Sequence, residues 1–275
     1  MRRFHAPPNA TLGVGASMPP RKAHRNTPRA SARGQSHAAA TPTGRAFEWP
    51  AVGDDDFDEN ERNVNRTDAY ASFKPQKTKR CVANHVFLND IIVVDGALTP
   101  RECQNIVGAI EGRDSDGFEL STSRGPKYGE AWRKNGRFQR EDEGFADALW
   151  KALTRRCGDT NIFDFDIDDA LGFNSNIRCY RYRGSEGEHF GAHVDGRVRA
   201  RGGQSKFTAL FYLSEVEEGG RTIFYDERGE ERCAIAPKTG RALFFRHGHD
   251  LPEHEGEMVH RGTKYVLRSD VMFKC

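Results

Sequence analysis

A run of short apolar segments separated by turn residues fills the second half of the chain and limits its fold more than any other feature. The segments expected to form strands span residues 176–183, 207–213, 221–225, 231–236, 241–246 and 263–273. Glycine or proline separates them, at Gly184, Gly202, Gly203, Gly219, Gly220, Gly229, Pro237 and Gly240. Many short strands at this spacing are typical of an all-β sandwich or barrel. The Gly219-Gly220 pair favours a tight turn over a ligand-binding loop.

Two helices are expected ahead of these strands. Residues 99–102, Thr-Pro-Arg-Glu, have the form of a capping box with proline at the first helical position, and apolar residues follow on one helical face as far as Gly112. A second helix is expected at about residues 141–155, and residues 87–95 are expected to form a strand that leads into the first helix. Helices followed by a run of strands predict an α+β chain with a helix-supported β-core.

The first 47 residues contain eight Lys and Arg side chains and no acidic residue. Because the whole chain has a net charge of +2, the remainder carries −6, and this mildly acidic body does not indicate a nucleic-acid binder. Residues 48–65 turn acidic and remain poor in periodic apolar side chains, so little apolar burial is available to offset the entropy of ordering. We therefore expect residues 1–80 to form a disordered tail and residues 81–275 to form one domain.

Three further sequence features bear on where the protein works. No apolar stretch approaches the length of about 18 residues that spans a bilayer, and no apolar segment follows Arg2 and Arg3 to make a secretory signal. Cys103, Cys179 and Cys233 fall at apolar positions, which predicts buried free thiols and a reducing compartment, although the even count of six also permits disulfides. We expect an intracellular, cytoplasmic protein, with organelle import through the Arg-rich tail as the alternative.

His193-Val194-Asp195 is the first half of a candidate metal site. Side chains two residues apart on an extended chain point to the same side, so both can reach one ion. Two histidines and one carboxylate on one face of an octahedron leave three positions open, an arrangement typical of non-haem Fe(II) oxygenases. A His-x-Asp pair alone is a weak signal, and a solvated turn explains it equally well.

The second half of the site is expected on a later strand. Histidines occur downstream at positions 247, 249, 254 and 260. In the segment 263–273, Lys264, Val266 and Arg268 share one face, and two cations on one face of an otherwise apolar strand are costly without an anionic partner. A dicarboxylate with one end on a metal and the other on a buried cation would supply that partner.

Five blocks of this sequence resemble the prolyl 4-hydroxylase-like branch of the 2-oxoglutarate/Fe(II) dioxygenases, from about residue 85 to the end. The blocks are Tyr180-Arg-Tyr182 with Phe190-Gly-Ala-His193-Val-Asp195, FTALFYLS at 207–214, EGGRTIF at 218–224, PKTGRALFF at 237–245, and His254-x-Gly256-x-x-Val259-x-x-Gly262-x-Lys264. The resemblance implies a double-stranded β-helix, or jelly roll, flanked by N-terminal supporting helices.

The resemblance also implies a role for each matching residue. His193, Asp195 and His254 would ligate iron, and Lys264 would pair with the distal carboxylate of 2-oxoglutarate. The other residues expected in the cosubstrate pocket are Arg268, Tyr182 and Tyr212. The implied cofactors are Fe(II), 2-oxoglutarate and O2, with ascorbate as reductant. His260 is out of register with the Gly-x-Lys block, and His247 and His249 are expected behind the ligands or at the surface.

The substrate and one rival class stay open at this stage. A peptidyl proline is the default substrate of the family, and another protein, a peptide or a small molecule is the alternative; nucleic acid and membrane are not expected, and the oligomeric state is undetermined. A zinc-binding or inactive jelly-roll binding protein could use the same ligand set. Residues 117–138, rich in Gly and Arg, are expected to form a surface loop or a flap over the site.

Overall fold

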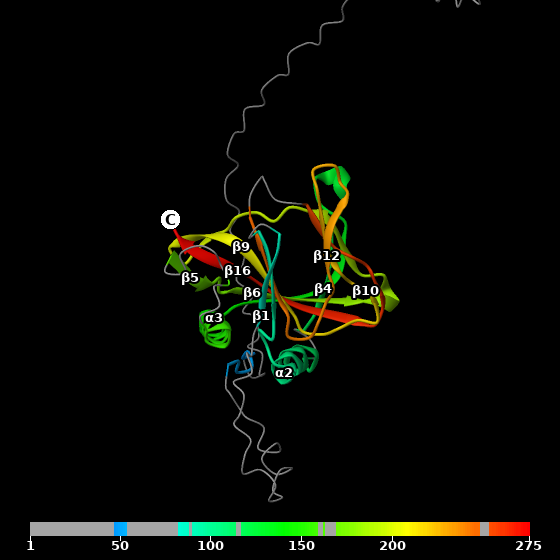
Figure 1. Cartoon of the computed structure of the whole chain (residues 1–275). Helices are drawn as coiled ribbons and strands as arrows, with labels where there is room; N and C mark the ends of the chain where they lie inside the picture. Colours follow the sequence, from blue (N-terminus) through cyan, green and yellow to red (C-terminus); the bar gives the residue numbers. More distant parts are fainter. Residues whose placement is uncertain are drawn as a thin grey trace, which may run out of the picture. The chain divides into compact units, whose positions relative to one another are not determined.

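The computed structural model describes residues 47–53, 82–87, 90–113, 117–158, 162, 169–247 and 253–275. Its elements in chain order are β1 (Val82–Phe87), β2 (Ile91–Asp95), α2 (Pro100–Glu111), β3 (Glu119–Thr122), η1 (Pro126–Tyr128), β4 (Arg133–Glu141), α3 (Glu143–Cys157), β5 (Ala170–Phe173), β6 (Asn176–Arg183), η3 (Gly184–Glu186), β7 (His189–His193), β8 (Arg199–Ala200), β9 (Gly203–Tyr212), β10 (Glu218–Gly219), β11 (Thr222–Tyr225), β12 (Glu231–Ile235), β13 (Ala242–Arg246), β14 (His254–Gly256), β15 (Val259–Arg261) and β16 (Thr263–Lys274). Figure 1 shows these elements along the chain.

Most strands belong to one curled, antiparallel sheet. Its order is β1-β2-β13-β9-β16-β6-β4-β7-β14-β11-β12, with β16 at the centre between β9 and β6. The curl brings Thr222 of β11 and His254 of β14 to the same cavity as Lys264 of β16, although these strands are far apart in the sheet order. The cavity therefore lies between the two halves of the sheet.

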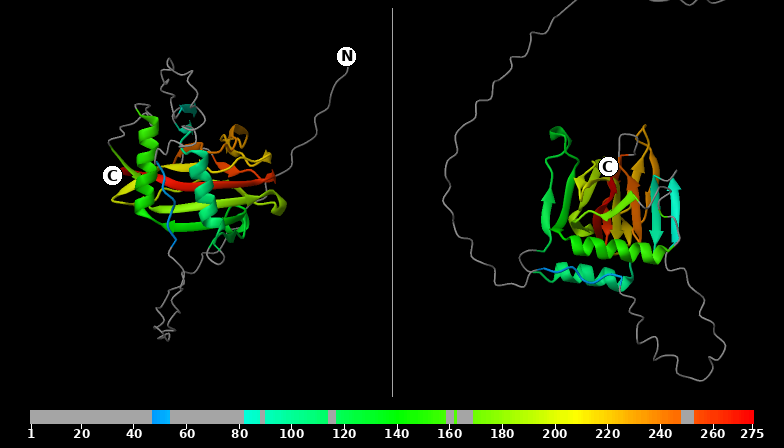
Figure 2. Two further views of the ribbon diagram at one scale, coloured as in Figure 1. Left: turned by 90° about the horizontal axis from the view of Figure 1, so that it is seen from below. Right: turned by 90° about the vertical axis from the view of Figure 1, so that its left-hand side faces the viewer.

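Both helices pack against one side of this sheet, as the views in Figure 2 show. Ile106 of α2 and Leu149 of α3 are fully buried in the same hydrophobic cluster as Phe211 of β9 and Phe244 of β13. The capping box predicted at the start of α2 is present: the Thr99 hydroxyl accepts from the Glu102 amide, and the Glu102 carboxylate accepts from the Thr99 amide. None of the helices in the described ranges is long and apolar enough to cross a membrane.

Residues 47–53 join this core, which departs from the expectation of a tail running through residue 80. Trp49 stacks on Phe145 of α3 with ring centroids 4.6 Å apart, and Val52 is buried. Two apolar side chains in a short segment leave no periodic pattern, so the sequence alone did not reveal this packing. The rest of residues 1–80 lies outside the described part of the chain.

Glu102 ties three segments together from the first turn of α2. Its carboxylate accepts from the Gly53 amide at 2.6 Å and from Arg156 of α3 at 2.8 Å, and both side chains are less than one-tenth exposed. Burial raises the pKa of Glu102, but the hydrogen bonds from Arg156, Thr99 and Gly53 outweigh it and hold the pKa below its usual value. The carboxylate is therefore charged and stabilising above that usual value, and its contribution is lost as the pH falls through the lowered pKa.

Glu102→Ala should lower the free energy of unfolding by about 3 kcal/mol at neutral pH, because it leaves the buried Arg156 cation without its partner. Urea denaturation followed by circular dichroism measures the change. Arg101→Ala, at an exposed position on the same helix, is the control and should stay within about 0.5 kcal/mol of the parent. Equal losses for the two variants would contradict the role given to this ion pair.

The observed strands match those expected at 176–183, 221–225, 231–236, 241–246 and 263–273 to within a residue or so, and β9 begins earlier than predicted. The Gly219-Gly220 turn is confirmed, with φ angles of 76° and 71°. In the segment 117–138, expected to be a surface loop or a flap, β3 and β4 form a hairpin connected by residues 123–132.

The cysteines follow the prediction in part. Cys103 and Cys179 are free and buried, and Cys233 is free and half-buried. Cys157 is disulfide-bonded, which the even count of cysteines had left open.

Candidate metal and cosubstrate site

His193, Asp195 and His254 converge at the cavity between the two halves of the sheet. His193 ends β7, Asp195 follows it by two residues, and His254 begins β14, which pairs with β7 so that His254 lies opposite His193. One ligand atom of each lies within 4.8 Å of the others. The Nε2 atoms of His193 and His254 lie 3.7 and 3.6 Å from the Asp195 carboxylate, close to the separation of about 3 Å for neighbouring ligands at metal–ligand bonds of about 2.1 Å.

The His193 ring is held in the tautomer that a metal requires. Its Nδ1 lies 2.9 Å from the Gly191 carbonyl, which can only accept, so Nδ1 carries the proton and Nε2 keeps its lone pair. Phe190 stacks on the ring at 3.8 Å and fixes its plane. Burial lowers the pKa of His193, which favours the neutral form that binds metal.

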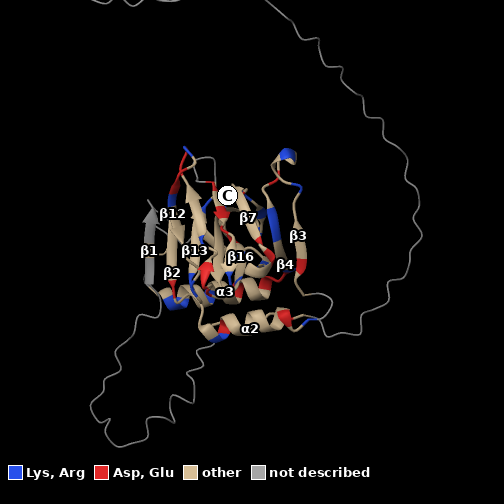
Figure 3. Cartoon of the chain, turned by 90° about the vertical axis from the view of Figure 1, so that its right-hand side faces the viewer, with Lys and Arg blue, Asp and Glu red and all other residues tan. Residues whose placement is uncertain are grey.

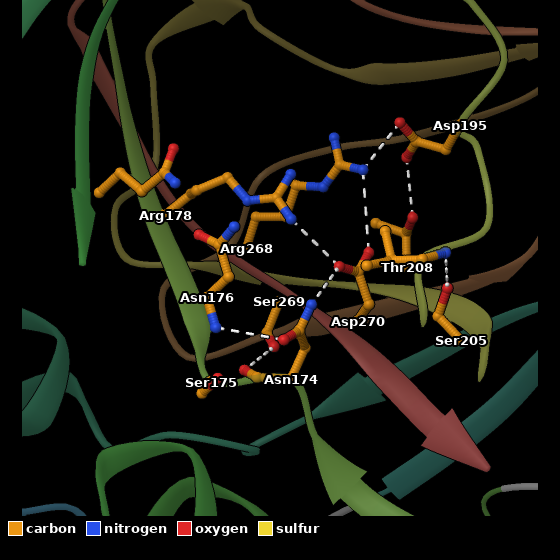
Figure 4. Close-up of polar contacts among 12 residues, drawn as sticks. Asn174, Ser175, Asn176, Arg178, Asp195, Ser205, Thr208, Arg268, Ser269 and Asp270 are labelled. Atoms are coloured by element: carbon orange, nitrogen blue, oxygen red, sulfur yellow. Dashed lines mark hydrogen bonds and ion pairs between the residues drawn. The ribbon is translucent and has the colours of Figure 1, made fainter. Parts of the chain in front are cut away.

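Asp195 has a partner on each carboxylate oxygen. Arg268 Nη2 lies 2.8 Å from Oδ1, and the Thr208 hydroxyl donates to Oδ2 at 2.8 Å (Figure 4). Burial raises the pKa of Asp195, but the charge of Arg268, the two histidines and the Thr208 hydrogen bond outweigh it and hold the pKa far below its usual range. The carboxylate is ionised and held in one orientation.

A directed chain of hydrogen bonds continues from Asp195 into the core. Because Thr208 gives its single proton to Asp195, it must accept from His247 Nε2, 2.7 Å away. The neutral His247 ring then accepts at Nδ1 from the Ser205 hydroxyl at 3.0 Å, and Ser205 accepts from the Val198 amide at 2.8 Å. The donor and acceptor of each hydrogen bond in this series are therefore determined. The series holds the Thr208 hydroxyl toward the Asp195 carboxylate.

Thr208→Val should weaken metal binding about tenfold, because the variant keeps the shape of the side chain but removes the donor to Asp195. Titration of the apoprotein with Mn(II), followed by electron paramagnetic resonance, measures the affinity. Thr208→Ser keeps the hydroxyl and should bind within about twofold of the parent. A valine variant with parental affinity would show that Arg268 alone is enough to orient the carboxylate.

Lys264 lies in the same cavity and is 3% exposed. Its Nζ lies 5.4 Å from the ring of Tyr182 and 5.5 Å from that of Tyr212, and within the described ranges no carboxylate pairs with it. Burial lowers the pKa of Lys264 to about 7. A buried cation without an anion beside a metal-ligand set fits a ligand that brings its own carboxylate.

Of the three other residues expected in the cosubstrate pocket, two line the cavity and one does not. Tyr182 lines the cavity, whereas Tyr212 is fully buried and its hydroxyl lies 2.7 Å from that of Thr222. Arg268 also lines the cavity, but its guanidinium is bound to Asp195, which the sequence did not indicate.

The remaining histidines are not part of the candidate metal site in the described residues. His260 is exposed on β15, and His247 is buried behind Asp195, as expected. His249 lies outside the described residues. Thr208 was missed because a threonine on a central strand carries no signal of its own, while its spacing of thirteen residues from Asp195 becomes a contact only through the fold.

Comparison with known proteins finds similarity over part of the chain. Residues 177–269 match the sequence profile described as the 2OG-Fe(II) oxygenase superfamily. Among curated proteins, the chain is 28% identical over 114 residues to "Probable prolyl 4-hydroxylase 3" of Arabidopsis thaliana, a match that covers 36% of this chain and 38% of that protein. The chain therefore spans well under half the length of this relative.

Solved structures show a more distant likeness. A collagen prolyl hydroxylase of Paramecium bursaria Chlorella virus-1 matches at 19% identity with a TM-score of 0.46, covering 67% of this chain and 96% of the viral one. A Pseudomonas putida prolyl-4-hydroxylase matches at 16% identity with a TM-score of 0.46, covering 68% and 94%. At these scores the likeness does not support an assignment of the site, which is argued from its own residues.

Proposed function

We propose that this chain, whose residues 177–269 match the profile of the 2OG-Fe(II) oxygenase superfamily, is an Fe(II)- and 2-oxoglutarate-dependent dioxygenase. The observation that carries the proposal is one cavity holding His193, Asp195 and His254 together with the buried, carboxylate-free Lys264. Two histidines and a carboxylate leave open positions on iron, and a buried lysine in the same cavity suits a dicarboxylate that reaches the metal with its other end.

The roles of the residues follow from this geometry. His193, Asp195 and His254 would hold the iron, and Lys264 would bind the distal carboxylate of 2-oxoglutarate beside Tyr182, which lines the same cavity. When bound, iron and 2-oxoglutarate would activate O2: 2-oxoglutarate would supply two electrons and leave as succinate and CO2, and one oxygen atom of O2 would enter a substrate C–H as hydroxyl. The protein orients the ligands and excludes water, and Arg268 and Thr208 keep Asp195 in place.

The finer assignments belong to the same proposal. We propose that the curled sheet is a jelly roll supported by α2 and α3, that ascorbate serves as reductant, and that the protein acts inside the cell. A protein or peptide substrate, with peptidyl proline first, is supported by the matched relative's name. The zinc-binding alternative is weakened by Lys264, because a structural or simple zinc site has no use for a buried cation nearby.

The test is succinate formation from 2-oxoglutarate by anaerobically purified protein supplied with Fe(II), ascorbate and air. Iron-dependent succinate production that disappears in His193→Ala is the expected result. Metal analysis of the same preparation completes the experiment. Tightly bound zinc with no turnover under any condition would replace this proposal with the binding-protein reading.

A further inference from the structure

Positive charge gathers on the cavity face of three neighbouring strands. Cross-strand pairs place Arg137 of β4, Tyr180 of β6 and Val266 of β16 side by side on that face. In the next row, Arg178 lies beside Arg268. Figure 3 shows Lys and Arg along β4. Five cationic side chains share the face, namely Arg133, Arg137, Arg178, Lys264 and Arg268.

Within the described part of the chain, only two carboxylates form ion pairs with these five cations. Asp270 pairs with Arg178 at 3.1 Å, and Asp195 pairs with Arg268 at 2.8 Å (Figure 4). Arg133, Arg137 and Lys264 form no ion pair in the described residues, although Glu119 of β3 lies across from Arg137. An Fe(II) ion and a 2-oxoglutarate dianion bound together would add no net charge, so they would not remove this surplus.

Arg133 and Arg137 account for most of the surplus. Arg133 donates to the Asn135 side chain at 2.9 Å, and Arg137 donates to the Gln139 side chain, so both partners are neutral amides. Arg133 Nη2 and Arg137 Nε are buried and have no hydrogen-bond partner. Buried guanidinium nitrogens that are neither neutralised nor bonded are costly, and a bound anion would satisfy both needs.

Arg133 is separated from the candidate metal ligand His193 by a single aromatic ring. The guanidinium carbon of Arg133 lies 4.3 Å from the ring centroid of Phe190, and Phe190 stacks on His193 at 3.8 Å. The same carbon lies 5.0 Å from the Tyr180 ring, which lines the cavity. Burial raises the pKa of Tyr180, but the charges of Arg268, Arg178 and Arg133 outweigh it, which marks a strongly positive surrounding.

We infer that Arg133 and Arg137 bind a carboxylate of the substrate beside Tyr180, so that the molecule hydroxylated is an organic acid. That the bound anion is a substrate rests on the proposed dioxygenase function. The anion site itself is argued from the contacts of Arg133 and Arg137 alone. One end of 2-oxoglutarate would bind the iron and the other would bind Lys264, so the anion at β4 is a second one. The carboxylate belongs to a free amino acid or to a peptide, and the turnover experiment below distinguishes the two.

Binding is tested without turnover by using Mn(II) in place of iron. In the Mn(II) protein saturated with 2-oxoglutarate, acetate is the probe and acetamide is its uncharged counterpart. Paramagnetic relaxation of the methyl protons reports how much of each probe sits near the metal. Acetate should be relaxed about tenfold more than acetamide.

Variants show whether the two arginines are responsible. R133Q and R137Q should each reduce the paramagnetic relaxation of the acetate methyl protons toward the level seen with acetamide. R137K should restore part of that relaxation because it restores the positive charge. R124Q is the control, since Arg124 is exposed on the same hairpin and pairs with Glu130. An acetate effect that survives R133Q and R137Q would come from direct coordination to Mn(II) and would overturn the inference.

Turnover with iron identifies the source of the carboxylate. L-Proline is compared with L-prolinamide, and a proline-ended peptide is compared with its C-terminal amide, by succinate formation. The acid of at least one pair should stimulate turnover more than its amide, and R137Q should raise the KM for that acid. If the acid and the amide of each pair stimulate turnover equally, the proposed anion site is rejected and the dioxygenase function is kept. If acetate binds but no substrate is turned over, the anion site is kept and the dioxygenase function is rejected.

Discussion

Asp195→Ala should abolish iron-dependent succinate formation and should also unfold more easily than His254→Ala. Both variants lose a ligand, so we expect each to lower turnover by more than about a thousandfold. Only the first also strips Arg268 of the carboxylate 2.8 Å from its Nη2, which leaves a buried charge without its nearest partner. Breaking such a pair costs about 3 kcal/mol.

Thermal unfolding of the metal-free proteins separates the two effects. His254 packs against the rings of Phe245 and Phe224 but, unlike Asp195, is not the counter-ion of a buried cation, so the alanine variant at 254 should lose less stability. Succinate formation is measured on the same preparations. If the metal-free Asp195→Ala protein is as stable as His254→Ala, then Arg268 is compensated elsewhere, with Asp270 the nearest candidate at 3.9 Å.

Two of the three candidate ligands could be anticipated from the sequence because their information is local, whereas His254 was assigned only through the family resemblance. His193 and Asp195 are two residues apart, and the alternation of a strand alone puts them on one side. Lys264 was visible for the same reason, as a cation within an apolar strand. Sequence alternation gives the face of a strand but not what lies across a barrel, and so the contact of Arg268 with Asp195 could not be foreseen.

The hairpin of β3 and β4 was missed for a different physical reason. A half-buried strand is recognised by apolar residues at every second position, but the cavity face of β4 carries Arg133, Asn135 and Arg137. These side chains lie on the same face of the sheet as Tyr180, away from the main hydrophobic cluster that contains Phe138 of the same strand. The strand that departs most from the expected pattern is therefore the one that bears the surplus charge.

Lys264→Ala should raise the KM for 2-oxoglutarate about a hundredfold, because it removes the cation expected to bind the distal carboxylate in a buried site. Affinity for Mn(II) should not change, since Lys264 pairs with none of the metal ligands. Arg268→Ala should show the opposite pattern, with metal affinity lowered through Asp195 and a smaller effect on the KM. A larger rise in the KM for Arg268→Ala would make Arg268 the main anchor of 2-oxoglutarate.

The pH dependence of the parent protein gives an independent view of the same residue. With burial holding the pKa of Lys264 at about 7, the cation is fully formed only below that value. Affinity for 2-oxoglutarate should therefore fall as the pH rises, by about fiftyfold between pH 7 and pH 9. Anaerobic titration of the metal-loaded protein with 2-oxoglutarate measures this, and Lys264→Arg, which stays charged, should flatten the profile. A profile that is already flat in the parent would mean that Lys264 stays protonated throughout, so that its burial does not control binding.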